Sequence, residues 1–228
     1  MDPAADALPH HSRFPSPHGG SAIFALQVVL VVLVPFVGYG QRLAPLSYVA
    51  AMFAVQSSTV FLLGYRRTAA ALLLVGAAVL TGVVVGGGLT GPLRLLLWAT
   101  LIAGGLVTVA LTLRASFAAR IPAVQRIFCG AAAYVMLGFV FAAIHGLTGF
   151  LLPGGYVLQP GLEGVRPIHW SDYVWLSFAT LTTAGFGDVV GVGPASSAVS
   201  SLEAIAGILF PATLIARIAS LVDGTRRA

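Results

Sequence analysis

Charged residues are scarce in this sequence. They make up 8% of its 228 positions, and lysine is absent: 12 arginines stand against seven acidic residues, for a net charge of +5. A soluble domain with so few charges would have too little polar surface to cover itself. Dispersed arginines without a polybasic cluster also argue against a nucleic-acid partner.

The sequence also lacks features that would indicate covalent or enzymatic chemistry. Its single cysteine, Cys129, cannot form an intramolecular disulfide, and we interpret it as a packing residue. No G-x-S-x-G, H-E-x-x-H or phosphate-binding loop is present. The paired halves with interrupted helices that many coupled transporters show are missing too. We therefore predict a protein that is not an enzyme and needs no cofactor, and keep a membrane enzyme or transporter as a weaker alternative.

What the sequence does contain is long apolar runs. Hydrophobic residues make up 58% of the chain, and the mean hydropathy is +0.96. About 20 mostly apolar residues are needed for a helix to cross the hydrocarbon of a bilayer. This length predicts an all-α membrane protein with six transmembrane helices, near residues 21–39, 46–64, 68–86, 93–114, 127–150 and 196–222.

The N-terminal arm, residues 1–20, is rich in proline, histidine, serine and glycine, and we expect it to be disordered. It carries too little positive charge, too far from the first apolar run, to resemble a typical signal peptide. The abundance of alanine and arginine without lysine is typical of a GC-rich bacterial genome.

The arginines in the loops predict an orientation. With a cytoplasmic N-terminus, eight arginines lie on the inner side and three on the outer side, which favours both termini in the cytoplasm of a multi-pass protein of the plasma membrane. The inner set is Arg13, Arg66, Arg67, Arg114, Arg120, Arg126, Arg226 and Arg227, and the outer set is Arg42, Arg94 and Arg166.

The segment between the fifth and sixth runs is too long for a simple turn. A polar loop that includes residues 153–167 leads to the apolar dozen WSDYVWLSFATL at residues 170–181, and TTAGFGD follows at residues 182–188. Twelve residues cannot cross a bilayer, so we predict a re-entrant helix capped by Ser171 or Asp172.

Non-helical backbone at membrane depth is tolerated only where it is buried in protein or lines a water-filled path. The glycines at 185 and 187 permit backbone angles that turn successive carbonyls toward one side, where they can replace the water shell of a cation. The negative end of the preceding helix dipole favours a cation there as well. One strand cannot surround an ion, so we expect a homotetramer around a shared axis.

At these residues the sequence resembles a known family. TTAGFGD is similar to the TTVGYGD filter signature of potassium channels in the pore-loop cation channel superfamily, and the resemblance covers roughly residues 127–228 as a pore domain. It implies passive potassium conduction, with K⁺ as the permeant ion. Carbonyls of Thr183, Ala184, Gly185 and Phe186 would bind the ion, Gly187 would complete the filter, and Thr182, Trp175 and Asp188 would support it.

The sequence departs from that signature at several positions. Phe186 replaces tyrosine, and its usual aromatic partner is Leu176, so both ends of one hydrogen bond are missing together. By the same resemblance Trp175 would donate to Asp188, and Ala179 stands where some relatives carry a buried glutamate. Ala184 replaces valine and removes packing, which keeps a non-selective cation channel open as an alternative. A silent subunit of a mixed tetramer is a further one.

The first four runs, residues 21–126, resemble a voltage-sensor domain only in number. The fourth carries Arg94 and Arg114 at its ends instead of an arginine at every third position, so we predict no conventional voltage sensor. We interpret these four helices as a packing domain whose glycines allow close helix contacts, at Gly82, Gly86 and the pair Gly104 and Gly105.

Several single residues in the last two runs are further candidates. Glu203 is an intramembrane acid, either functional or a structural anchor hydrogen-bonded to the back of the pore helix. His145 is either a pH sensor or, as is commoner for a lone histidine among apolar residues, simply packed, and His169 is interpreted as a solvated loop residue. Gly207 and Pro211 are candidates for a gating hinge. The predicted cavity wall consists of Ile208, Pro211 and Ile215, with Ala219 and Val222 at its inner end.

The stimulus for gating does not follow from the sequence. About six residues follow the sixth run, so we expect no attached ligand-binding domain.

Overall fold

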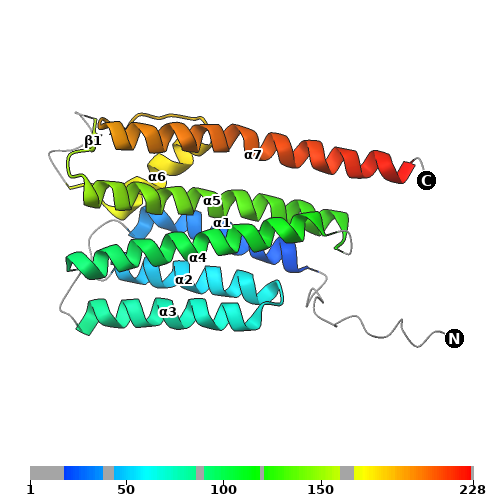
Figure 1. Cartoon of the computed structure of the whole chain (residues 1–228), viewed down its shortest axis with the longest axis horizontal. Coiled ribbons are helices and arrows are strands. Elements are labelled where there is room, and N and C mark those ends of the chain that lie inside the picture. Colours follow the sequence, from blue (N-terminus) through cyan, green and yellow to red (C-terminus); the bar gives the residue numbers. More distant parts are fainter. Residues whose placement is uncertain (1–17, 38–43, 86–89, 119–120, 160–166, 227–228) are drawn as a thin grey trace.

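The computed structural model describes residues 18–37, 44–85, 90–118, 121–159 and 167–226. These residues form an elongated helical bundle with a small two-stranded antiparallel sheet at one end (Figure 1). The helices are α1 (Gly19–Val37), α2 (Ala44–Leu62), α3 (Arg66–Val85), α4 (Gly91–Phe117), α5 (Ala123–Leu151), α6 (Trp170–Leu181) and α7 (Pro194–Arg226), and the strands are β1 (Tyr156–Leu158) and β2 (Val189–Gly191).

A helix lies at each of the six predicted runs. Within the described residues, four of them are long and apolar enough to cross a membrane: α3, α4, α5 and the Pro194–Ala216 part of α7. The apolar stretches of α1 and α2, Gly19–Leu33 and Leu46–Leu62, are shorter. A mostly helical architecture with helices that are long and apolar enough to span a membrane is therefore confirmed, while the six crossings and the re-entrant course of α6 stay predictions.

Helix α5 forms the centre of the bundle and contacts α1, α4, α6 and α7. Its Met136, Phe139 and Ala143 are fully buried in the main hydrophobic core. By contrast, only 11% of the most apolar stretch of α7 is buried within the chain, against 56% of the corresponding stretch of α5. A single chain thus leaves most of α7 uncovered, and lipid or another protein surface must cover it.

Glycines bring α4 close to its neighbours, as predicted at Gly104 and Gly105. A β-carbon at Gly104 would lie 2.6 Å from Gln56 Oε1 of α2, and one at Gly105 would lie 2.5 Å from Val140 Cγ2 of α5. At Gly82 the nearest atom would be at 3.4 Å, an ordinary contact, so the prediction of a close approach there is wrong. Gly86 lies outside the described residues.

The beginning of α1 and the end of α7 lie at one end of the bundle and the two-stranded sheet at the other (Figure 1). The predicted disordered arm of residues 1–20 is too long, because α1 already begins at Gly19. A β-carbon at Gly20 would lie 2.6 Å from the Gln125 carbonyl, and the Ser21 N–H donates to Gln125 Oε1 at 3.0 Å, so this first turn is held against α5. Residues 1–17 lie outside the described residues.

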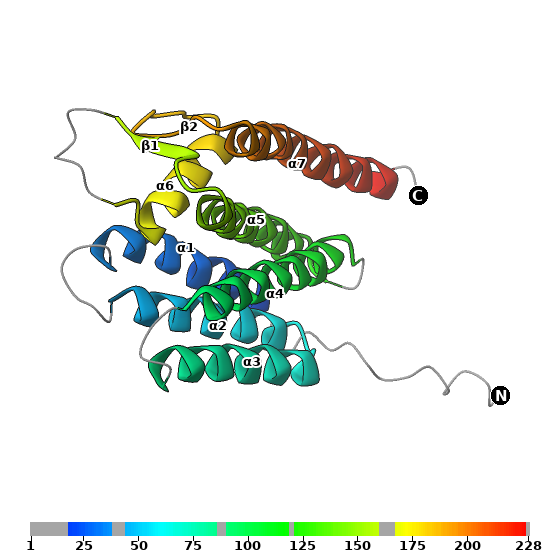
Figure 2. The same ribbon diagram turned by 60° about the vertical axis from the view of Figure 1, so that its left-hand side comes forward.

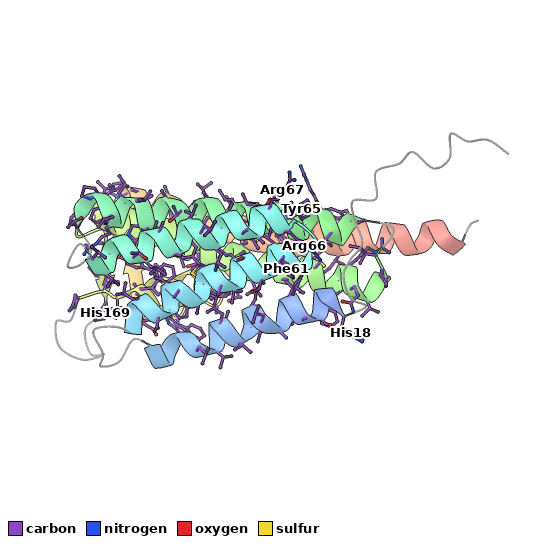
Figure 3. The ribbon with its side chains drawn as sticks, turned by 90° about the horizontal axis from the view of Figure 1, so that it is seen from below. His18, Phe61, Tyr65, Arg66, Arg67 and His169 are labelled. Atoms are coloured by element: carbon purple, nitrogen blue, oxygen red, sulfur yellow. The ribbon has the colours of Figure 1, made fainter. Side chains whose placement is uncertain are left out.

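The arginines of α3 and α4 lie at helix ends. Arg66 and Arg67 start α3 beside Phe61 and Tyr65, toward the end of the bundle where His18 lies, with His169 at the opposite end (Figure 3). The Arg66 guanidinium lies 5.7 Å from the Phe61 ring centroid, and the Arg94 guanidinium lies 5.3 Å from that of Phe150. Both guanidinium groups make cation–π contacts at a helix end, so neither charge has to lie at the centre of the membrane.

Candidate functional site

Helix α6 has the twelve residues that were predicted, and its start is held by a reciprocal cap. The N-cap is His169, and the Asp172 carboxylate accepts the backbone N–H of His169 at 2.7 Å. The prediction that Ser171 or Asp172 is the N-cap is therefore wrong. Asp172 acts from the third helical position instead, as the acid of a capping box does. His169 itself is exposed, as expected.

In the segment after α6, residues 183–187, the backbone φ angle alternates between positive and negative values. Thr183, Gly185 and Gly187 have positive φ angles of 59°, 56° and 80°, whereas Ala184 and Phe186 do not. A β-branched residue such as Thr183 rarely adopts this conformation, so the surroundings must hold it there. Alternation of left- and right-handed residues turns successive peptide planes so that neighbouring carbonyls can face one side, whereas in a regular strand they alternate.

Backbone hydrogen bonds fix the start of this segment to the end of α6. The N–H groups of Thr182, Thr183 and Gly185 donate to carbonyls of Phe178, Thr180 and Ala179 at 3.0, 3.0 and 3.1 Å. Within the described residues, no donor reaches the carbonyl oxygens of residues 183–187. These oxygens are therefore free to bind a ligand.

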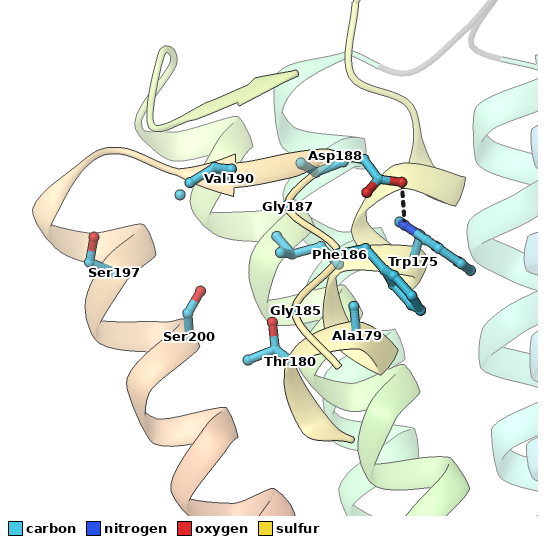
Figure 4. A pocket seen from close by; sticks show the side chains of 13 residues that line it. Trp175, Ala179, Thr180, Gly185, Phe186, Gly187, Asp188, Val190, Ser197 and Ser200 are labelled. Carbon is cyan, nitrogen blue, oxygen red and sulfur yellow. Dashed lines mark hydrogen bonds between the residues drawn. The ribbon is translucent and has the colours of Figure 1, made fainter. Parts of the chain in front are cut away.

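The outer end of the segment is held by the pair Trp175 and Asp188. The Trp175 indole donates to Asp188 Oδ2 at 2.9 Å, which is the hydrogen bond that the resemblance implied (Figure 4). The Trp175 and Phe186 rings are stacked with centroids 4.9 Å apart. Leu176 packs instead with Tyr156 and Val189, so it leaves no polar group beside Phe186.

A two-stranded sheet attaches the segment to the loop after α5. Strands β1 and β2 are antiparallel, with Val157 opposite Val190, and the Gln159 N–H donates to the Asp188 carbonyl at 2.9 Å. In Figure 2, α6 lies between this sheet and α1. These strands were not predicted, since three-residue strands give no period that the sequence could show.

One side of the segment is not covered by its own chain. Residues 182–186 are exposed, and Phe186 keeps 61% of its surface accessible. An open cavity of about 340 Å³ lies beside it, between Trp175 and Ala179 of α6, the segment itself and Ser197 and Ser200 of α7 (Figure 4). An exposed, largely apolar surface of this kind is typical of a site that contacts lipid or another protein.

Helix α7 touches the end of α6 backbone to backbone at Gly207. A β-carbon there would lie 2.1 Å from the Leu181 carbonyl oxygen. The Tyr134 hydroxyl of α5 donates to the same oxygen at 2.8 Å. The hinge candidate Gly207 is thus also a packing glycine, and Pro211 lies inside the continuous helix one turn later.

The predicted cavity wall is exposed in the single chain at Ile208 and Ile215, and half-exposed at Pro211. This exposure is compatible with a wall that faces water or a partner. For Ala219 and Val222 the structure describes only the helical backbone, so their predicted place stays a prediction.

Glu203 is fully buried and bonded to the back of α6, as one of the two interpretations expected. Its Oε1 is hydrogen-bonded to Ser177 Oγ, and its Oε2 lies 2.8 Å from His145 Nε2. His145 is fully buried, as the interpretation of a packed histidine expects, and it is hydrogen-bonded as well, because its Nδ1 also lies 2.8 Å from the Tyr156 hydroxyl. The sequence held only one hint of this group, which was two ionisable residues within apolar runs.

Residues 133–223 match a protein-family model described as "Ion channel". The match begins in α5, includes α6 and the alternating segment, and ends in α7. Comparisons with curated proteins and with solved structures gave no match. The family match supports an ion channel, and with it passive ion conduction by a membrane protein rather than catalysis.

Proposed function

We propose that four copies of the chain form a potassium-selective channel in the plasma membrane, with the backbone of residues 183–187 as its selectivity filter. The observation that carries this proposal is the alternating φ sign at Thr183, Gly185 and Gly187, at the end of a twelve-residue helix. Rings of backbone carbonyls are how potassium channels replace the water shell of the ion. K⁺ would bind at the carbonyls of Thr183, Ala184, Gly185 and Phe186.

The tetramer supplies what a single chain lacks. One strand offers carbonyls from one side only, and closed symmetry around an axis would bring three more strands to face it. The exposed Phe186 ring and the uncovered face of α7 would then be buried by neighbouring subunits or bilayer lipid. The same arrangement makes α6 a re-entrant helix, whose carboxyl end points a negative dipole toward the ion path.

The six helices α1–α5 and α7 would all cross the membrane. Because the beginning of α1 and the end of α7 lie at one end of the bundle (Figure 1), an even number of crossings fits, with both termini in the cytoplasm and the two-stranded sheet outside. With no row of arginines in α4, the first four helices serve as a packing domain, and opening depends little on voltage.

The test is ion flux into liposomes that contain the purified full chain, with rubidium or potassium against sodium. We expect potassium flux well above sodium flux, and a tetrameric mass in detergent. Gly185→Ala should abolish selective flux, because alanine is strained at a φ of 56°. Gly154→Ala is the matched control: Gly154 has a φ of 85°, and like Gly185 has no atom within 4 Å of an added β-carbon, but it lies outside the filter.

A non-selective cation channel is the second candidate, favoured by Ala184, which removes side-chain packing behind the filter. Equal sodium and potassium fluxes in the wild type, both lost in Gly185→Ala, would establish it. Absence of flux from a purified homotetramer would contradict both candidates.

A further inference from the structure

A buried polar chain of four side chains, Tyr156, His145, Glu203 and Ser177, joins four elements of the pore region. Tyr156 comes from β1, His145 from α5, Glu203 from α7 and Ser177 from α6. The last three are fully buried, and Tyr156 keeps 6% of its surface accessible. The contacts run from Tyr156 through His145 and Glu203 to Ser177, and Ser177 Oγ also lies 2.7 Å from the Gly138 carbonyl oxygen of α5.

The hydrogens in this chain can be counted. A serine hydroxyl carries one hydrogen, and the Gly138 carbonyl can only accept. When Ser177 donates to that carbonyl, its contact with Glu203 Oε1 must be donated by a protonated Glu203. Glu203 Oε2 then accepts from His145 Nε2–H, and His145 Nδ1 accepts from the Tyr156 hydroxyl. In this arrangement the four side chains and the Gly138 carbonyl all have a hydrogen-bond partner, and the buried polar chain carries no net charge.

We propose that the buried polar chain is a proton-binding site, in which Glu203 holds one proton and thereby ties the inner helix α7 to the back of the pore helix α6. Loss of this proton leaves a carboxylate in a fully buried position beside a neutral imidazole. A buried charge without a compensating partner is costly, so deprotonation favours separation of α7 from α6.

The titratable groups packed against the buried polar chain are phenols, which supply no counter-charge to Glu203. Tyr173 of α6 packs edge-on against Tyr156 at 5.3 Å, and Tyr134 of α5 donates to the Leu181 carbonyl. Burial raises the pKa of the Tyr156 hydroxyl above its ordinary value, so it remains a neutral donor. Asp172 is engaged at the start of α6.

The site is placed to affect the proposed filter. Glu203 lies one helical turn before Gly207, and Ser177 lies one turn before Leu181. Gly207 and Leu181 are the two residues whose backbones touch. Separation at Glu203 therefore loosens the contact at the residue just before the filter segment. This consequence for conduction rests on the proposed function, whereas the proton site itself does not.

Infrared spectroscopy of the full chain in nanodiscs tests the proton site without any ion flux. We expect a carbonyl band of a protonated carboxylic acid that disappears on titration to alkaline pH and is absent in Glu203→Gln. Asp188→Asn, which removes the acid at the end of the alternating segment, is the control, and it should keep the band. A wild-type spectrum that has no such band at any pH where the protein is folded, or a band that is lost in Asp188→Asn instead, would overturn the proposal.

Flux measurements test the link to conduction. We expect wild-type potassium flux to fall several-fold at alkaline pH, and Glu203→Gln to conduct without that fall. Glutamine can donate to Ser177 and accept from His145, and it cannot lose a proton. If potassium flux is present but equally pH-dependent in both proteins, the link is wrong. If no protein conducts and the infrared band is present, the proposed function fails and the proton site stands.

Discussion

The backbone of Gly207 in α7 touches the backbone of Leu181 at the end of α6, since a β-carbon on Gly207 would lie only 2.1 Å from the Leu181 carbonyl oxygen. No side chain separates the two helices at this point. Leu181 is followed directly by the segment with alternating φ, so any displacement of α7 here acts on the first residues of that segment.

Gly207→Ala adds only one methyl group, but it should destabilise the packing of α7 against α6. The added methyl group must push α7 away from α6, and overpacking of this kind typically costs about 1–3 kcal/mol. We expect a lower melting temperature of the detergent-solubilised protein and a loss of potassium flux. The matched control is Gly91→Ala, because Gly91 has no atom within 4 Å of an added β-carbon. Equal melting temperatures for both variants would contradict the contact.

Tyr134→Phe removes the hydroxyl that donates to the Leu181 carbonyl. The ring is retained, together with its packing against Phe210 at 5.7 Å between centroids. Removing a single neutral hydrogen bond should lower the free energy of unfolding by about 1 kcal/mol. The measurement is a denaturation curve, and Tyr65→Phe, at an exposed ring, serves as the control. A loss equal to that of the control would show that the bond at Leu181 adds nothing.

Trp175→Phe removes the indole donor to Asp188 while keeping an aromatic ring to stack on Phe186. We expect the outer end of the segment to loosen, so that potassium protects the protein less against thermal unfolding. A double-mutant cycle with Asp188→Asn measures the coupling between the two side chains. Strictly additive effects of the two substitutions would show that the 2.9 Å hydrogen bond does not support the filter.

Ala184→Val restores the larger side chain of the potassium-channel signature. If the small residue leaves the filter loosely packed, the variant should show a higher ratio of potassium to sodium permeability than the wild type. The reversal potential under bi-ionic conditions in a planar bilayer measures that ratio. A variant with the same ratio as the wild type would mean that packing at this position does not control selectivity.

Voltage should have little effect on opening. Each charge that crosses the whole membrane field contributes about 2.3 kcal/mol per 100 mV, and the two arginines of α4 lie near its ends, where they need not move. We expect a shallow conductance–voltage curve that is unchanged in Arg94→Gln. A steep sigmoidal curve, or a shift of its midpoint in that variant, would reveal a sensor.

Predictions that depend on local sequence succeeded. The twelve residues of α6 were found from an apolar run bounded by polar loops, because a run of that length is too short to cross and too regular for a turn. The Trp175–Asp188 hydrogen bond followed from a resemblance whose spacing the chain preserves. The close approaches at Gly104 and Gly105 followed from small residues in an apolar helix.

Predictions that needed contacts between distant helices did not succeed. His145 and Glu203 are 58 positions apart, and nothing in either run shows that the two helices turn these side chains toward each other. The N-cap of α6 was misplaced because a capping box can place its acid at the third helical position, so Asp172 alone does not mark the helix start.

The antiparallel pairing of Val157 with Val190, together with the bond from Gln159 N–H to the Asp188 carbonyl, ties the loop after α5 to the end of the segment with alternating φ. Residue 188 is thus linked to the end of β1 through main-chain hydrogen bonds, with no helix in between. If residues 183–187 form the proposed filter, a ligand that binds the two-stranded sheet would change permeation without entering the pore.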